Sequence, residues 1–129
     1  MPTEQYHEPP GELSAEARTY ARMITSLQEE TEAIGWYAQR ISLEPDDEAR
    51  AIMENAQMEE FKHFSMDLEF LLRRTPTWRE IAKGVLFQDG DIVEHGEEAE
   101  AEATGDDDDP GGRASGTSAD GSLGIGSLR

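Results

Sequence analysis

The fold is decided by two stretches, LQEETEAIGWYAQR at residues 27–40 and NAQMEEFKHFSMDLEFLLRR at residues 55–74. In both stretches apolar residues recur every three or four positions, which is the spacing of one face of an α-helix. Only a short, proline-containing segment separates the two helical patterns. The sequence therefore predicts an antiparallel hairpin of two long helices.

The ends of the two helices follow from the residues that favour helix termini. Ser14 is a good N-cap for the first helix, which is predicted to run to about Ile41. Pro45 suits the first position of the second helix, which is predicted to run to about Arg73.

A short third helix is predicted from about Pro76 to Leu86, capped by Thr75 or Thr77. Thr77 and Glu80 have the spacing of a capping box. No strand-type alternation is found, so the expected fold class is all-α: a two-helix hairpin with a short third helix.

Each long helix carries one apolar stripe at heptad-like spacing, here called its seam. The first seam is Tyr20, Met23, Leu27, Glu30, Ile34, Tyr37 and Ile41. The second seam is Ala49, Met53, Ala56, Glu60, His63, Asp67 and Phe70. Both seams turn polar at their centres, although a buried carboxylate is costly unless it is paired, protonated or bound to a metal.

Glu30 and Glu60 lie equally far along the chain from Pro45, where the hairpin turns, so the two are expected at the same height. His63 lies one helical turn from Glu60 on the same face. Two carboxylates and one imidazole are a donor set for iron, manganese or zinc. Asp67, one turn further, is a candidate hydrogen-bond acceptor for the imidazole. The alternative is a solvated acidic face with a hydrogen-bonded histidine.

These donors are half of a known arrangement. A di-iron carboxylate bundle takes one Glu from each of two helices and Glu-x-x-His from each of two others. One chain has one helix of each kind, and a lone hairpin makes a poor core. The sequence therefore predicts that two hairpins dimerise into a ferritin-like four-helix bundle with the metal site between them.

A second cluster, formed by Glu29, Glu32 and Trp36, lies on a face of the first helix turned away from Glu30. It is either a cation-attracting access site or ordinary surface carboxylates beside an amphipathic Trp. Tyr37 is either core packing or a group that orients a ligand or quenches a radical.

The composition limits the function. Asp plus Glu number 29 against 11 Lys plus Arg, which gives a formal charge of −18. This charge argues against nucleic acid as a partner and favours cations. Cysteine is absent, which excludes disulfides and thiolate sites, and no apolar run is long enough to predict a membrane span.

Hydrophobic residues make up 36% of the chain, and the deficit is concentrated at the C-terminus. The predicted organisation is an extended segment (1–12), a helical domain (13–93), a disordered acidic and glycine-rich linker (94–121) and a terminal peptide (122–129). That peptide, SLGIGSLR, contains three apolar residues at the end of an otherwise polar tail: Leu123, Ile125 and Leu128. It is either an arbitrary end or a docking peptide on a flexible tether.

The two helical stretches, together with VLFQDG at 85–90, resemble the encapsulated ferritins, which are ferritin-like cargo proteins of encapsulin nanocompartments. SLGIGSLR is similar to the peptide by which such cargo docks on the inner wall of the encapsulin shell. The sequence departs from the family pattern at Lys62, Asn55 and Gly35.

The resemblance implies a ferroxidase that oxidises Fe(II) with oxygen or peroxide at a di-iron site shared by two chains. Glu30, Glu60 and His63 match the family's iron ligands. Glu29 and Glu32 match its access carboxylates, beside Trp36, where calcium or another divalent cation is expected. Tyr37 matches an aromatic residue next to the iron.

The resemblance also implies a decamer, formed as a ring of five dimers. The protein would lie in the lumen of a cytoplasmic encapsulin compartment, where mineral collects. The alternative is a non-catalytic iron-binding or structural cargo protein of the shell.

Overall fold

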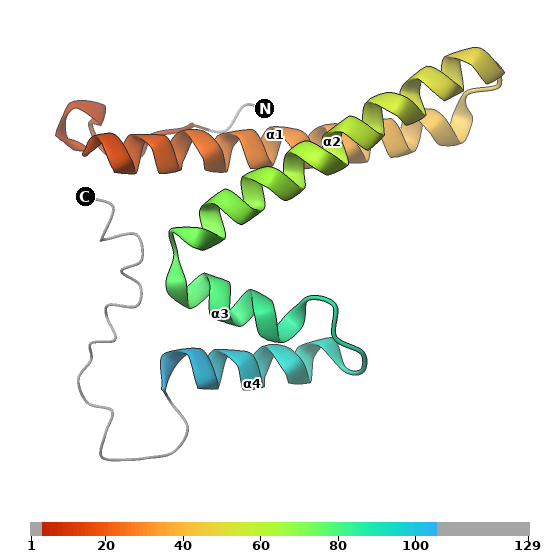
Figure 1. Cartoon of the computed structure of the whole chain (residues 1–129). Helices are drawn as coiled ribbons and strands as arrows, with labels where there is room; N and C mark the ends of the chain where they lie inside the picture. Colours follow the sequence, from red (N-terminus) through yellow and green to blue (C-terminus); the bar gives the residue numbers. More distant parts are fainter. Residues whose placement is uncertain (1–3, 106–129) are drawn as a thin grey trace. The chain divides into compact units, whose positions relative to one another are not determined.

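The computed structural model describes residues 4–105, which form two compact units, one within residues 1–71 and the other beginning at residue 72 (Figure 1). The described residues are helical and contain no strand, as the all-α prediction requires. The helices are the 3₁₀ turn η1 (Pro10–Glu12), α1 (Ala15–Leu43), α2 (Asp47–Arg73), α3 (Pro76–Val85) and α4 (Ile92–Thr104).

Part of the predicted linker (106–121) and the terminal peptide (122–129) lie outside the described residues. Within residues 4–105, no helix combines the length and the apolar character that crossing a membrane requires.

The predicted start of α1 is confirmed. The side-chain oxygen of Ser14 accepts a hydrogen bond of 3.0 Å from the backbone N–H of Ala17, as an N-cap does. The segment before it is not wholly extended, because Pro10–Glu12 form a 3₁₀ turn. Arg18 ties this turn to α1 by donating to the carbonyl oxygens of Pro10 and Leu13, at 3.0 and 2.6 Å.

The predicted start of α2 at Pro45 is wrong, because the helix begins at Asp47. Asp46 is the reason: its Oδ1 accepts from the Ala49 N–H at 2.8 Å, and this satisfies an otherwise unpaired helix N–H. Glu44 stabilises the turn, since its Oε2 accepts from the Asp46 N–H at 3.0 Å. Pro45 therefore lies in the turn itself. The end of α2 at Arg73 agrees with the prediction.

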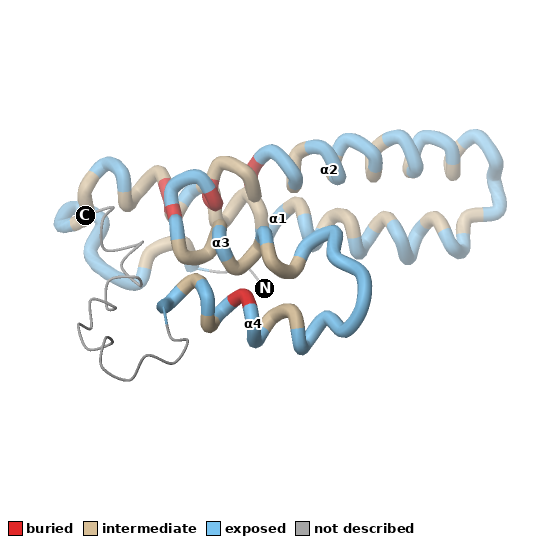
Figure 2. The backbone as a smooth tube through the Cα atoms, turned by 60° about the horizontal axis from the view of Figure 1, so that its bottom comes forward, coloured by how far each residue is buried: buried red, intermediate tan, exposed pale blue. Residues whose placement is uncertain are grey.

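The two seams lie on the protected faces of α1 and α2. Every residue of both seams is buried or half-buried, and Tyr20 and Asp67 are the most protected, at 9% exposed each. Figure 2 shows half-buried and exposed positions alternating along the two helices. Gln57 holds the helices together by donating from Nε2 to the backbone oxygen of Ile34 at 3.1 Å. Most seam residues remain only half-buried, which leaves room for a further apolar partner.

The second unit is a shorter helical hairpin of α3 and α4. Thr75 occupies the N-cap position of α3, so the predicted capping box at Thr77 and Glu80 is wrong. The helix ends at Val85, one residue before the predicted end.

Helix α4 overturns the prediction that disorder begins at residue 94, and it crosses the predicted domain boundary at 93. Asp91 caps its start by accepting from the Glu94 N–H at 2.9 Å. Gly105 ends it in the left-handed conformation (φ 70°) that favours glycine. The acidic composition of this segment therefore describes an exposed helix face rather than a disordered chain.

Close packing of Gly84 on Ala99 brings α3 and α4 together. A Cβ placed on Gly84 would lie 2.6 Å from the Cβ of Ala99, and Ala99 is buried, at 7% exposed. The connecting loop is held by the His95 ring, whose Nε2 lies 2.7 Å from the backbone oxygen of Asp89. Only a residue without a side chain fits where the two helices meet.

We predict that Gly84→Ala destabilises the second unit by about 1–2 kcal/mol, because its methyl group overpacks the contact. Gly96→Ala is the matched control, since nothing lies within 4 Å of its added Cβ and alanine favours helix. Amide hydrogen exchange of α3 and α4 measures the difference. Equal protection in the two variants would show that this contact does not hold the helices together.

Candidate metal centre

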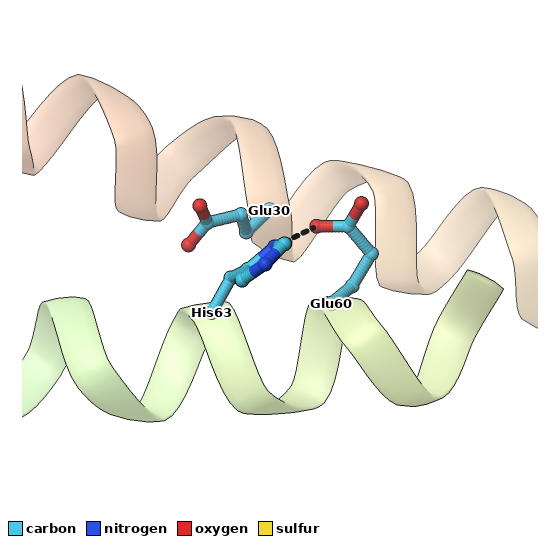
Figure 3. A group of neighbouring side chains, drawn as sticks. All are labelled: Glu30, Glu60 and His63. Atoms are coloured by element: carbon cyan, nitrogen blue, oxygen red, sulfur yellow. Dashed lines mark ion pairs between the residues drawn. The ribbon is translucent and has the colours of Figure 1, made fainter. Parts of the chain in front are cut away.

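Three potential metal donors meet between α1 and α2. Glu30 extends from α1, and Glu60 and His63 extend from successive turns of α2 (Figure 3). One donor atom of each side chain lies within 4.8 Å of the donor atoms of the other two, and all three residues are half-buried. In residues 4–105 no other group of three or more His, Asp or Glu side chains comes together in this way. The structure thus brings together the three residues that the sequence selected.

The distances within the group are those of side chains that are close but not tightly bonded. His63 Nδ1 lies 3.8 Å from Glu60 Oε1. In the view of Figure 3 the imidazole ring lies between the two carboxyl groups. A cation among the three would be offered two oxygens and one nitrogen, which is a donor set suited to iron.

Asp67 lies against Glu30. The atoms Glu30 Oε1 and Asp67 Oδ2 are both fully buried and have no hydrogen-bond partner in the structure. The Glu30 and Asp67 carboxyl groups nevertheless lie close enough to share a hydrogen bond, which forms when one of the two groups carries a proton. The sequence makes Asp67 a candidate acceptor for the His63 imidazole, and the structure brings its carboxyl group next to the Glu30 carboxyl group on α1.

This environment changes the acidity of Glu30. Burial is the largest cause, followed by the hydrogen bond to Asp67 and the negative charges of Asp67, Glu60 and Glu29, and together they raise the Glu30 pKa to about 7. Near neutral pH the metal-free site therefore holds a proton on this carboxyl group for much of the time. A bound cation would counteract this shift, because a positive charge nearby favours the ionised carboxylate.

Glu59 has the opposite environment although it is adjacent in sequence to Glu60. Its Oε1 lies 2.9 Å from Lys62 Nζ on the exposed side of α2, and this ion pair lowers the Glu59 pKa. Lys62 therefore pairs with a surface carboxylate. Glu59 serves below as a control for changes to the buried acids.

The residues assigned to metal access are more exposed than the central group. Glu29 and Glu32 are exposed, and Trp36 beside them is 49% exposed. No third acidic or histidine side chain joins these two carboxylates within the described range. Tyr37 is half-buried, and the Arg40 guanidinium lies 5.3 Å from the centre of its ring.

The docking residues Leu123, Ile125 and Leu128 lie outside the described residues. Gln57 joins the two helices but was not among the residues predicted to do so. Its position could have been read from the sequence, because Gln57 is a polar residue that lies next to the seam of the second helix, between Met53 and Glu60.

Comparisons with known proteins agree on one family. The model of the EncFtn-like family matches residues 5–89. A protein of Thermotoga maritima named ferritin-like protein is 40% identical over 109 residues, which cover 84% of this chain and 92% of that protein. An encapsulated ferritin-like protein of Rhodospirillum rubrum is 41% identical over 125 residues, which cover 95% and 86%.

A solved structure extends this likeness to the fold. The crystal structure of protein ne0167 from Nitrosomonas europaea matches with a TM-score of 0.67 and 39% sequence identity. The match covers 70% of this chain and 99% of the chain in that structure.

The raised pKa of Glu30 predicts that Glu30→Gln stabilises the metal-free protein at pH 8 but not at pH 5. The folded-state pKa of about 7 exceeds the ordinary glutamate pKa of 4.5, so the wild type loses stability as the pH rises between them. The amide carries no charge and can donate to Asp67. We expect a gain of about 1–3 kcal/mol at pH 8.

Urea unfolding of chelator-treated protein, at one fixed protein concentration, measures this difference between variant and wild type. The same gain in unfolding free energy at both pH values would contradict a raised pKa of Glu30.

Proposed function

Because the chain belongs to the EncFtn-like family of encapsulated ferritins, we propose that it is a ferroxidase that oxidises Fe(II) to Fe(III) inside an encapsulin nanocompartment. The observation that supports this activity most strongly is the convergence of Glu30, Glu60 and His63 within 4.8 Å on two half-buried seams. Iron is the substrate of the reaction, and the products are Fe(III) and the reduced oxidant.

The donor types suit a change in the oxidation state of iron. Glu30 and Glu60 offer oxygen donors and His63 offers a nitrogen donor, a mixed set that iron accepts. Anionic oxygens stabilise Fe(III) more than Fe(II), so a carboxylate-rich site favours loss of an electron. The half-buried position strengthens this effect, because charges interact more strongly away from water.

The di-iron site of this proposal lies between two copies of the chain. One chain supplies three donors, which is half of the set used by di-iron carboxylate bundles. A second hairpin packed on the half-buried seams would supply the other three and complete a four-helix core. Glu30 from each chain would then bridge the two iron ions, and Glu60 and His63 of each chain would together hold one of the two. Five such dimers in a ring form the decamer that we propose as the working assembly.

The proposed route of iron to this site is electrostatic. The chain carries a formal charge of −18, which raises the local concentration of cations at its surface. Glu29 and Glu32 are exposed on the turn that carries Glu30 and would form the access site, with Trp36 beside them. Calcium or another divalent cation would compete with Fe(II) for these oxygens. Tyr37 would lie next to the bound iron.

The electrons balance with either oxidant. Two Fe(II) ions release two electrons, and hydrogen peroxide accepts them with two protons to form two molecules of water. Oxygen accepts two electrons and two protons to form peroxide. The Fe(III) formed would collect as mineral in the lumen of a cytoplasmic encapsulin shell, to which SLGIGSLR at 122–129 would dock the protein.

Alanine variants of the central group test the enzyme assignment. We expect Glu30→Ala, Glu60→Ala and His63→Ala each to slow aerobic Fe(II) oxidation at least about tenfold, because each removes a donor. Glu59→Ala is the matched control, since it removes an exposed carboxylate from the same helix. Absorbance of Fe(III) is followed at several iron-to-protein ratios.

Unchanged rates in all three variants would contradict the proposal. Uptake of iron in the wild type without repeated rounds of oxidation would instead favour the non-catalytic iron-binding alternative.

Deletion of residues 122–129 separates packaging from chemistry. We expect the truncated protein to be absent from encapsulin shells after co-expression and to oxidise Fe(II) at the wild-type rate, since no donor is lost. Particle isolation followed by protein quantification measures packaging. Normal loading of the truncated protein would assign docking to another part of the chain.

A further inference from the structure

Gln57 makes a polar contact between α1 and α2 next to the candidate metal centre. Its side-chain Nε2 donates to the backbone oxygen of Ile34 at 3.1 Å, and both residues are half-buried. Ile34 follows Glu30 along α1, and Gln57 precedes Glu60 along α2. The hydrogen bond therefore lies about one helical turn from both carboxylates, on the side of the hairpin turn.

The acceptor of this hydrogen bond lies where α1 is least constrained. The Ile34 carbonyl belongs to the peptide group that precedes Gly35, the one glycine of α1. Glycine weakens the middle of a helix because its backbone has the most conformational freedom to lose. Nothing lies within 4 Å of a Cβ placed on Gly35, so no packing contact restrains the backbone on that side. A bend of α1 at this point would move Glu30 relative to the donors on α2.

The metal-free group requires a restraint of this kind. Glu30 and Glu60 come together from different helices, and their carboxylates repel each other when both are ionised. This repulsion acts to separate α1 from α2 at the level of the donors. The Gln57 amide is neutral, so its hydrogen bond opposes the separation without adding a charge that would alter the attraction of the group for a cation.

We propose that Gln57 is a positioning residue of the metal centre, which holds the Glu30 donor of α1 beside the donors of α2. This inference rests on the proposed function, because it concerns the same site. Gln57 contributes no donor to the ion. It fixes the two helices before the ion arrives, so that binding does not have to order them. Loss of its hydrogen bond should therefore leave the number of bound ions unchanged and weaken the binding of each.

Cobalt(II) binding to the full-length, metal-free protein tests this role without depending on iron oxidation. Gln57→Met keeps the length of the side chain and removes the donor, and Gln57→Asn keeps the amide but shortens its reach by one methylene group. Arg50→Met is the matched control, because it removes a similar bond, from Arg50 Nη1 to the Glu44 backbone oxygen at 2.8 Å. Arg50 lies about 15 Å along α2 from Glu60, which is beyond the range of unscreened charge effects at physiological salt.

Three measurements separate positioning of the donors from general stability of the hairpin. Calorimetry gives the affinity and stoichiometry of Co(II), and the visible d–d absorption reports the coordination of the ion. Urea unfolding of the metal-free proteins gives the stability of each variant. Glu60→Ala is the reference for loss of a central donor.

We expect both Gln57 variants to bind as many Co(II) ions per chain as the wild type, about tenfold more weakly, with an altered d–d spectrum. Arg50→Met should bind like the wild type even where urea unfolds it more easily. If Glu60→Ala loses binding while the Gln57 variants match Arg50→Met in affinity and spectrum, the inference is overturned and the proposed function stands.

Equal weakening of binding by Arg50→Met and the Gln57 variants would also overturn the inference, since any loss of hairpin stability would then have the same effect. If Glu60→Ala binds Co(II) like the wild type, the proposed function fails, and the inference fails with it.

Discussion

The structure depends on the placement of charged donor side chains in the apolar seam between α1 and α2. Glu30, Glu60, His63 and Asp67 occupy seam positions at which a long helical hairpin would ordinarily carry leucine or isoleucine. Withdrawing charges from water costs free energy unless they are paired, so these half-buried and buried donors weaken the metal-free hairpin. The pKa of Glu30, raised to about 7, is a direct sign of that cost. A bound cation would turn the same residues from a source of instability into a bond between the two helices.

The same constraint explains why one copy of the chain is incomplete. The seam residues are half-buried rather than fully buried, and the central donors number three. A second hairpin would cover the remaining apolar surface and supply further donors in one step. Under the proposed function, assembly and metal binding therefore depend on the same seam residues, and damage to either should affect the other.

The sequence predicted the hairpin well because its signals are local. Ser14 caps α1 through its own side chain, and the heptad-like spacing placed both seams on protected faces. The convergence of Glu30 with Glu60 and His63 followed from their equal distance from the turn at residues 44–46. Shifting the start of α2 from Pro45 to Asp47 did not change this register, because Pro45 remains in the middle of the turn.

The errors came from competition between local signals and from contacts distant in sequence. Asp46 caps α2 in preference to a start at Pro45. Helix α4 was missed because its acidic composition resembles that of a disordered segment, although Asp91 and Gly105 were readable as its two ends. Its stability also depends on the contact of Ala99 with Gly84, which no local pattern contains. The meeting of Asp67 with Glu30 depends on the direction of side chains across two helices, which spacing along one helix does not fix.

Anomalous diffraction at the iron edge would show whether this seam binds iron between two copies of the chain. Crystals soaked in Fe(II) should show two anomalous peaks, related by a two-fold axis, between paired α1–α2 hairpins. Glu60 and His63 of one copy should lie beside each peak, with Glu30 shared between them. Paired hairpins with these side chains turned toward solvent, and no anomalous signal between the copies, would contradict the account.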